Sequence, residues 1–598
     1  MKIETRRRRR FSSTILGPSG GRRLGVAGRT FSTNFLQAFA ILGRSTAAPR
    51  IKTLNADVEY YDESSQQTRS CVSGCCAAHH LCVVRVLTGK EKRLMRKQPI
   101  EKPAVRLGKS KPKALRARAN FAARLIAVVI LFAATRGYAD EPIDIGSRRE
   151  LFVDDLLIDR MDGVALRLHH PIKTTRPESP LPRVAYTTVI KDKDEMGVLF
   201  RAYWRGSDRS FTGERHTGHA GETVAYAESR DGHDWTFPKL GLHEVSGTRR
   251  NNVILANQPP LLTNFSPFID TRPGVPRDER YKALAGYPGP GNKQGKAKPG
   301  IGLFAFYSAD GIHWTKQGEV IPYQDKWRHA FDSQNVSFWS DAEQQYVCYF
   351  RTWTPEDKLR SISRTTSLDF QTWTKPIPMN PNRPGEHLYT NQTHPYFRAP
   401  HIYIALPTRY VMGRGEPSAS IEKNNATDVL LMTSRAGNTH YDRTFQDVFI
   451  RPGLDASAWT NRANYVALNV VPTSPTEMSI YHRSGDRYTL RIDGFASAHA
   501  SFKTGELLTR PVTFAGDSLH INFSTSAAGS VRVELQRPNG SVIPGFSLNE
   551  SDLIFGDEID REVRWAGSTL TSIAGQPVRL RFIMQECDLY SFQFPNSE

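Results

Sequence analysis

Three acidic residues stand at or just before apolar, strand-like runs of the sequence. They are Asp332 in AFDSQNVSFW, Glu386 in GEHLYTNQTHPYF and Glu477 in PTEMSIYH. Two carboxyl groups that lie close together acquire different pKa values, because like charges and partial burial keep one of them protonated. Such a pair can act as general acid and as nucleophile or base on the two sides of a glycosidic bond. The three residues are therefore candidate catalytic carboxylates for sugar chemistry, provided that the fold brings them together.

Residues suited to binding a sugar surround these acids. They combine amide, guanidinium, hydroxyl and carboxylate groups with flat apolar faces such as that of Trp353. The candidate substrate-binding residues are Glu222, Asn264, Arg328, Asn335, Tyr389, Asn391 and Arg409. Glu222 is also a fourth candidate acid, which a long loop would carry over the site. The alternative is structural, with the acids capping strands or pairing with Arg328, Arg351 and Arg409.

A short motif repeats three times between strand-like segments. Its copies run from Ser229 to Trp235, from Ser308 to Trp314 and from Ser367 to Trp373, with serine, aspartate and tryptophan at constant offsets. Serine and aspartate side chains bind backbone amides in tight turns, glycine accepts a positive φ, and tryptophan can wedge between packed sheets. Each copy follows an alternating apolar run and leads into WTF or WTK. The motif therefore indicates a turn between the third and fourth strands of a repeated four-stranded unit.

Five such units follow one another, and no helical periodicity intervenes. The sequence predicts an all-β chain with a five-bladed β-propeller at residues 183–500 and a C-terminal β-sandwich at 501–598. Residues 140–182 are expected to form an edge strand or short helix that leads into the first blade. A propeller gathers the starts of its innermost strands around the axis, so the three candidate acids would converge from different blades.

The formal charge of +20 belongs to the N-terminal part of the chain. Residues 1–139 contain 28 Lys and Arg against 7 Asp and Glu, which leaves 52 against 53 for residues 140–598. Arginines before an apolar run at 125–134, followed by small residues, indicate a secretory signal cleaved after Ala139. Ten apolar residues are too few for a stable membrane span. We therefore expect an exported, periplasmic or extracellular protein without a nucleic-acid partner, and Met95 as the true start.

No residue pattern indicates a cofactor. The cluster of Cys71, Cys75, Cys76 and Cys82 with His79 and His80 lacks paired CxxC spacing, and the histidines at 216, 219, 387 and 394 lack metal-site spacing. A structural calcium ion on the propeller axis has no support in the sequence. The Gly- and Lys-rich insertion at 286–300 does not match a phosphate-binding loop. Cys348 and Cys587 are predicted to be buried free thiols.

The repeated S-x-D-[GL]-x-x-W turns followed by a β-sandwich resemble the secreted five-bladed glycoside hydrolases of the superfamily that contains families 32, 43 and 68. ELFVDDLLID, AFDSQN, LYTN and FSTSAAGSVRVELQ also resemble uncharacterised exported proteins of planctomycete-type bacteria, over about residues 145–595. The resemblance implies that Asp332 stabilises the transition state and that Glu386 is the general acid. Because Asn264 stands where the family has a nucleophilic aspartate, Glu477 or Glu222 would act as base, through water in an inverting reaction.

Three function classes follow from these patterns. The first is a glycoside hydrolase that acts on a poly- or oligosaccharide, the second is a non-catalytic carbohydrate-binding propeller, and the third is a scaffold whose centre is filled by salt bridges. The pairing of the acids separates them: uncompensated carboxylates favour catalysis, whereas carboxylates paired with arginine favour the scaffold.

Overall fold

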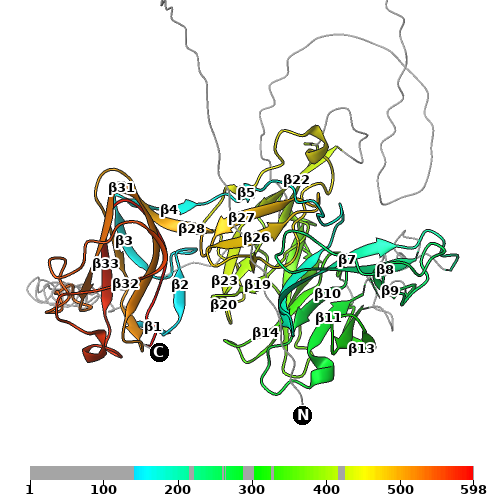
Figure 1. The fold of residues 1–598 in the computed structure, drawn as a ribbon, viewed down its shortest axis with the longest axis horizontal. Helices are drawn as coiled ribbons and strands as arrows, with labels where there is room; N and C mark the ends of the chain where they lie inside the picture. Colours follow the sequence, from blue (N-terminus) through cyan, green and yellow to red (C-terminus); the bar gives the residue numbers. More distant parts are fainter. Residues whose placement is uncertain are drawn as a thin grey trace, which may run out of the picture. The chain divides into compact units, whose positions relative to one another are not determined.

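The computed structural model describes residues 141–213, 221–258, 262, 264–286, 302–324, 327, 329–414 and 424–596. In this part the chain is all-β, and its described helical segments are three-residue 3₁₀ turns (Figure 1). Several predictions concern residues outside the described ones. These are the leader 1–139 with its cleavage site and Cys/His cluster, the start at Met95, His216, His219, the insertion from 287 to 300, and Arg328.

Three four-stranded antiparallel sheets follow one another along the chain, each with its strands in sequence order. Their strands are rich in β-branched and aromatic residues, and apolar runs such as YVCYF are buried on both faces. The first sheet contains β6 (Thr188–Asp194), β7 (Gly197–Ser207), β8 (Glu222–Ser229) and β9 (Val253–Ala256); the second contains β10 (Ser266–Ile269), β11 (Tyr281–Ala285), β12 (Gly302–Ser308) and β13 (Thr315–Pro322); the third contains β14 (Val336–Ser340), β15 (Gln345–Trp353), β16 (Arg360–Ser367) and β17 (Ile377–Pro378).

The repeated motif forms the predicted turn in all three sheets. In the first copy, the Gly232 N–H donates to Ser229 Oγ at 2.9 Å, and the His233 and Asp234 N–H groups donate to Asp231 Oδ1 at 2.7 and 3.0 Å. The copies at Ser308 and Ser367 repeat these bonds. The motif therefore has the structural role that the sequence indicated.

The predicted fourth strand at WTF or WTK forms fully only in the second sheet. In the first and third sheets this segment makes single bridges, Glu228 to Thr236 and Ser367 to Trp373, and β9 and β17 complete the sheet edge instead. Pro238 and Pro376 explain the difference, because proline has no N–H to continue a strand ladder. The second copy has no proline there, and β13 continues.

The fourth set of strands is divided between two sheets, whereas the sequence predicted one unit. The break falls at Pro407, which lies between consecutive strands and cannot donate to the ladder. One sheet contains β18 (His387–Leu388), β21 (Thr408–Met412), β22 (Asn425–Leu430) and β24 (Val448–Ile450); the other contains β19 (His394–Tyr396), β20 (Ala399–Ala405) and β23 (Met432–Arg435).

The fifth set takes its last strand from the N-terminal segment. β25 (Val471–Pro472), β26 (Glu477–Tyr481) and β27 (Arg487–Arg491) are followed at the edge by β5 (Ile172–Lys173), with Tyr488 opposite Lys173. The sequence predicted an edge strand or short helix leading into the first unit; the strand instead joins the last one. β6 also bonds to the chain just before β25, since the Val189 N–H donates to the Leu468 carbonyl at 3.1 Å.

The first strands of the sets adjoin one another. β6 contacts β10 and β25, and β14 contacts β10 and β19. In four sets the residue two positions before this strand has a positive φ, which is uncommon outside glycine: Tyr186 (58°), Asn264 (61°), Gln392 (51°) and Asn469 (77°). Equivalent backbone positions therefore recur just before these adjoining strands.

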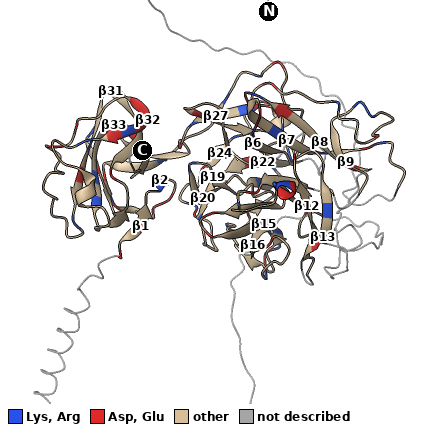
Figure 2. Ribbon diagram, turned by 60° about the horizontal axis from the view of Figure 1, so that its bottom comes forward, with Lys and Arg blue, Asp and Glu red and all other residues tan. Residues whose placement is uncertain are grey.

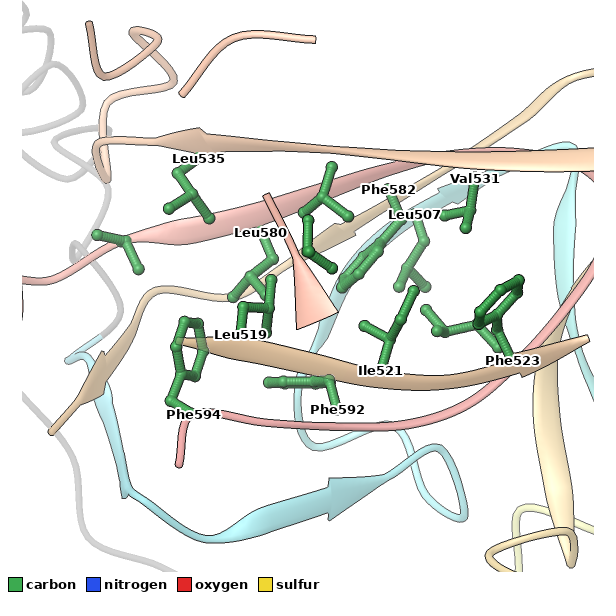
Figure 3. Close-up of a cluster of buried hydrophobic side chains, with 14 of the residues drawn as sticks. Leu507, Leu519, Ile521, Phe523, Val531, Leu535, Leu580, Phe582, Phe592 and Phe594 are labelled. Atoms are coloured by element: carbon green, nitrogen blue, oxygen red, sulfur yellow. The ribbon is translucent and has the colours of Figure 1, made fainter. Parts of the chain in front are cut away.

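A further large sheet contains the C-terminal strands. It has the order β3 (Ile158–Asp162), β29 (Gly505–Thr509), β33 (Arg579–Gln593), β28 (Ala496–Ala500) and β4 (Val164–Leu168), with β31 (Leu519–Gln536) between β33 and β32 (Asp557–Val563) and β2 (Arg149–Leu151) on β33. β1 (Ile143–Gly146) pairs separately with β30 (Val512–Phe514). Leu519, Ile521 and Phe523 alternate inward in β31 and pack against Phe582 and Phe592 (Figure 3). The lead-in segment thus contributes strands to this sheet as well.

Buried ion pairs connect this lead-in segment to the fourth set. Arg435 donates to Glu150 at 2.7 Å and to Asp154 at 2.8 and 3.0 Å, and His401 lies 3.0 Å from Glu150.

Elsewhere Lys and Arg are interspersed with Asp and Glu over the described strands (Figure 2). No described helix is long and apolar enough for a bilayer. The thiols of Cys348 and Cys587 are free and buried, as predicted.

Candidate functional site

Asp332 lies in the turn before β14 and pairs with Arg351 of β15. The Phe331 N–H donates to the Arg351 carbonyl at 3.1 Å, which fixes this turn against the strand. Burial would raise the pKa of Asp332, but Arg351, Arg462 and Arg360 outweigh it and hold the pKa below its usual value. The Asp332 side chain nevertheless keeps 33% of its surface exposed, whereas Arg351 keeps 3%. Asp332 is therefore an ionised carboxylate that solvent reaches.

Three guanidinium groups gather around the ring of Tyr389. The Cζ atoms of Arg351, Arg360 and Arg462 lie 4.9, 5.1 and 5.7 Å from the ring centroid, within cation–π range. Arg351 lies near the end of β15, Arg360 begins β16, and Arg462 comes from the chain before the fifth set. We call Asp332, Arg351, Arg360, Arg462 and Tyr389 the hub cluster.

A row of aromatic rings passes through this cluster at Tyr389. Arg360 also lies over the rings of Trp353, at 4.7 Å, and Tyr410, at 5.0 Å. The rings follow one another with centroid distances of 5.4 to 6.1 Å. In order they are Trp353, His387, Tyr410, Tyr389, Tyr465 and Tyr186. Trp353 and Tyr410 are only partly buried, so the cluster offers flat faces beside its charged groups.

The surroundings keep the neighbouring titratable side chains neutral. Burial, together with Arg360 and Arg351, lowers the pKa of His387 to about 4. Burial and the nearby Tyr389 raise the pKa values of Tyr186 and Tyr465 well above the usual value for tyrosine. At neutral pH the charges of this region therefore belong to the arginines and to Asp332.

Glu386 makes a separate ion pair. Its carboxylate accepts from both terminal nitrogens of Arg443, one of them at 3.2 Å, and from the Arg383 N–H at 3.2 Å. The side chain is 8% exposed. Its neighbour His387 joins the row of aromatic rings, but Glu386 itself is held by Arg443. The predicted convergence of Glu386 with Asp332 is not among the contacts of the described residues.

Glu477 lies at the start of β26 and pairs with Arg487 at 2.7 Å. It lines a hollow of about 350 Å³ together with His169, His170 and Tyr590. The residues of this hollow come from the fifth set, the lead-in segment and the large sheet, and none belongs to the hub cluster. Glu477 therefore faces different surroundings from those of Asp332.

The predicted binding residues occupy several environments. Asn264, Asn335 and Asn391 are buried and donate to backbone carbonyls at 3.2 to 3.5 Å, so their amides hold neighbouring segments of the chain together. Glu222 is buried 3.6 Å from Arg205. Arg409 donates twice to Asp428, at 2.9 and 2.6 Å. Tyr389 stands in the hub cluster. Catalytic and binding roles for all these residues remain predictions.

Sequence reasoning missed Arg360, Arg462 and Tyr410 as members of a site. Arg360 stands directly opposite Trp353 in the pairing of β15 with β16. That register was the available signal, since a hairpin places facing side chains together. Arg462 carried no such signal, because its position depends on contacts between distant sets. The described residues contain no group of three or more His, Cys, Asp or Glu placed to hold a metal ion.

Comparisons with known proteins give similarities at the level of structure. No protein-family model and no curated protein matches the chain. Similar solved structures include an N-acetylgalactosamine deacetylase from F. plautii in complex with blood group B trisaccharide (TM-score 0.34, 10% identity, 70% of this chain and 95% of that chain). A thermostable family-43 glycoside hydrolase (0.32, 9%, 54% and 92%) and a fructofuranosidase from Schwanniomyces occidentalis complexed with fructose (0.27, 10%, 71% and 98%) are also similar.

Proposed function

We propose that residues 183–500 form a five-bladed β-propeller, with a C-terminal β-sandwich at 501–598, in an exported protein that binds a carbohydrate. Five successive sets of strands, their adjoining first strands and the repeated turn motif support the propeller. In this arrangement β5 completes the last blade. The hub cluster then lies where the starts of the inner strands meet, which is where propellers place their binding groups.

The observation that carries the proposal is an accessible carboxylate among guanidinium groups and flat rings. Asp332 accepts a hydrogen bond from Arg351 and keeps a third of its side chain exposed, while Arg351 and Arg360 bring guanidinium donors. Trp353 and Tyr410 present apolar faces beside them. A sugar ring needs this combination, because its hydroxyl groups form hydrogen bonds and its C–H faces pack on aromatic rings.

Binding is favoured over cleavage because the candidate acids are paired. Hydrolysis needs one carboxylic acid that can donate a proton and a second carboxylate across the scissile bond. Asp332, Glu386 and Glu477 each pair with an arginine, and their partners differ. This pairing counts against cleavage, whereas the exposed part of Asp332 and the partly buried rings of Trp353 and Tyr410 favour carbohydrate binding over a purely structural scaffold.

Hydrolysis is the second candidate, and the ionised, accessible Asp332 favours it. A carboxylate in that state can stabilise the positive charge that develops on a sugar ring during bond cleavage. Glu386 would act as general acid only after leaving Arg443.

Binding of the full-length protein to a panel of fructans, arabinans, xylans and sulfated algal glycans tests the proposal. We expect at least one glycan to bind, with affinity reduced about tenfold by Trp353→Ala, since the stacking face is lost. Phe502→Ala is the matched control, because Phe502 is 73% exposed and lies outside the hub cluster. Binding that Trp353→Ala leaves unchanged, or binding to none of the glycans, contradicts the proposal.

A further inference from the structure

The hub cluster and the adjoining Trp353 contain buried hydrogen-bond donors that no described residue satisfies. Nε and Nη1 of Arg351, Nε of Arg360 and Nε1 of Trp353 have no hydrogen-bond partner in the described part of the chain. An unpaired buried donor is unfavourable, and most of all on a charged group. These donors belong to neighbouring side chains, because Arg360 lies over the Trp353 ring and both arginines lie over Tyr389. They indicate a ligand that brings acceptor oxygens.

The charges of the cluster are also unbalanced. Arg351, Arg360 and Arg462 stay protonated at any physiological pH. Among the described residues Asp332 pairs with Arg351, and its charge also acts on Arg360 and Arg462. Asp332 accepts a hydrogen bond from one terminal nitrogen of Arg351, and the guanidinium groups of all three arginines lie over the Tyr389 ring. Burial and the charge of Arg351 lower the pKa of Arg360, as expected for crowded like charges. A negative charge on the ligand would relieve this repulsion.

We infer that the sugar bound at the hub cluster carries an anionic oxygen group, either the carboxylate of a uronic acid or a sulfate ester. The inference rests on the proposed carbohydrate binding and deepens it. Guanidinium groups bind such groups through two parallel hydrogen bonds, since their planar fork matches the spacing of the oxygens. Arg351 and Arg360 supply the free buried donors, and Arg462 supplies an exposed positive charge at the rim. The aromatic faces of Trp353 and Tyr410 hold the ring that bears the charge.

Matched pairs of ligands test this inference with the full-length protein. One pair is an oligogalacturonate and its methyl ester, and the other is a sulfated glycan and its desulfated form. We expect the acidic member of at least one pair to bind about tenfold or more tightly than its neutral partner, and the two pairs distinguish a carboxylate from a sulfate. Added salt should reduce the difference, because ions screen the exposed charge of Arg462.

Substitution of Arg462 tests whether the hub cluster causes the preference for the acidic ligand. The change should not disturb the core, since this side chain is exposed. We expect Arg462→Gln to weaken binding of the acidic ligand about tenfold and to leave the neutral ligand unaffected, while Arg462→Lys restores part of the loss. Arg230→Gln is the control, because Arg230 pairs with Asp194 on an exposed edge of the first sheet. Equal affinity for acidic and neutral partners overturns the inference but leaves the proposed function intact. Absence of binding to every carbohydrate overturns the proposed function itself.

Discussion

Replacement of Glu386 by glutamine separates a structural role from a catalytic one. Glu386 is 8% exposed and forms a two-point ion pair with Arg443, which is 11% exposed. Glutamine keeps one acceptor but loses the charge, so Arg443 remains buried without its counter-charge. A hydrogen bond to a charged group contributes about 1.5–3 kcal/mol, and we expect the unfolding free energy to fall by about 2–3 kcal/mol.

This loss corresponds to a small but measurable change in melting temperature. An unfolding entropy of roughly 2.1 cal/mol/K per residue over about 450 folded residues gives about 1 kcal/mol/K, hence a fall of about 2–3 °C. Scanning calorimetry measures the shift, and binding to the glycan panel should be unchanged. Asp194→Asn, in an exposed pair, should leave the melting temperature unaltered. If Glu386→Gln abolishes glycoside release while its melting temperature equals that of the unsubstituted protein, our structural assignment of Glu386 is refuted.

Three further predictions concern the fold. Arg435→Met leaves two buried carboxylates, Glu150 and Asp154, without their arginine partner and should lower the unfolding free energy by about 3–5 kcal/mol at pH 7. Scanning calorimetry measures the loss, and a melting temperature equal to that of the parent would count against it. Burial holds the pKa of His394 at about 4, so the unfolded chain binds the proton first and unfolding free energy should fall by about 1.4 kcal/mol per unit as pH drops from about 6.5 to 4. Thermal scans of His394→Gln should show a flatter pH dependence than the parent, and an identical slope would contradict this. A Cβ at Gly232 would lie 2.8 Å from a buried tyrosine hydroxyl, whereas a Cβ at Gly437 meets no atom within 4 Å. Gly232→Ala should therefore lower the melting temperature more than Gly437→Ala does. Equal falls in melting temperature for the two variants would contradict this prediction.

The local parts of the fold were predictable because their causes are local. The turn at Asp310 forms from hydrogen bonds within a few residues, and the serine, aspartate and glycine offsets encode them. The proline effects at Pro238 and Pro376 were readable in principle, since proline ends a ladder wherever it stands. The position of β5 was not predictable from the sequence. This two-residue strand pairs with a partner more than 300 positions away and leaves no periodic signal.

The candidate site was predictable only in part for the same reason. Asp332 and Tyr389 were singled out from their places before and within strand-like runs, and the structure brings both into the hub cluster. Glu386 has an equivalent place, yet its side chain turns to Arg443, 57 positions along the chain. The direction of a side chain at a strand start depends on which distant partner is nearest, and sequence spacing does not determine that.

The pairing of β5 with β27 also limits the order in which the strands can form during synthesis. Residues 172–173 leave the ribosome long before residues 488–489, so the early segment must wait, unpaired, until almost all of the polypeptide has emerged. A nascent chain that stops before residue 487 has no edge for β5 to join. Completion of the fifth sheet is therefore a late, long-range step.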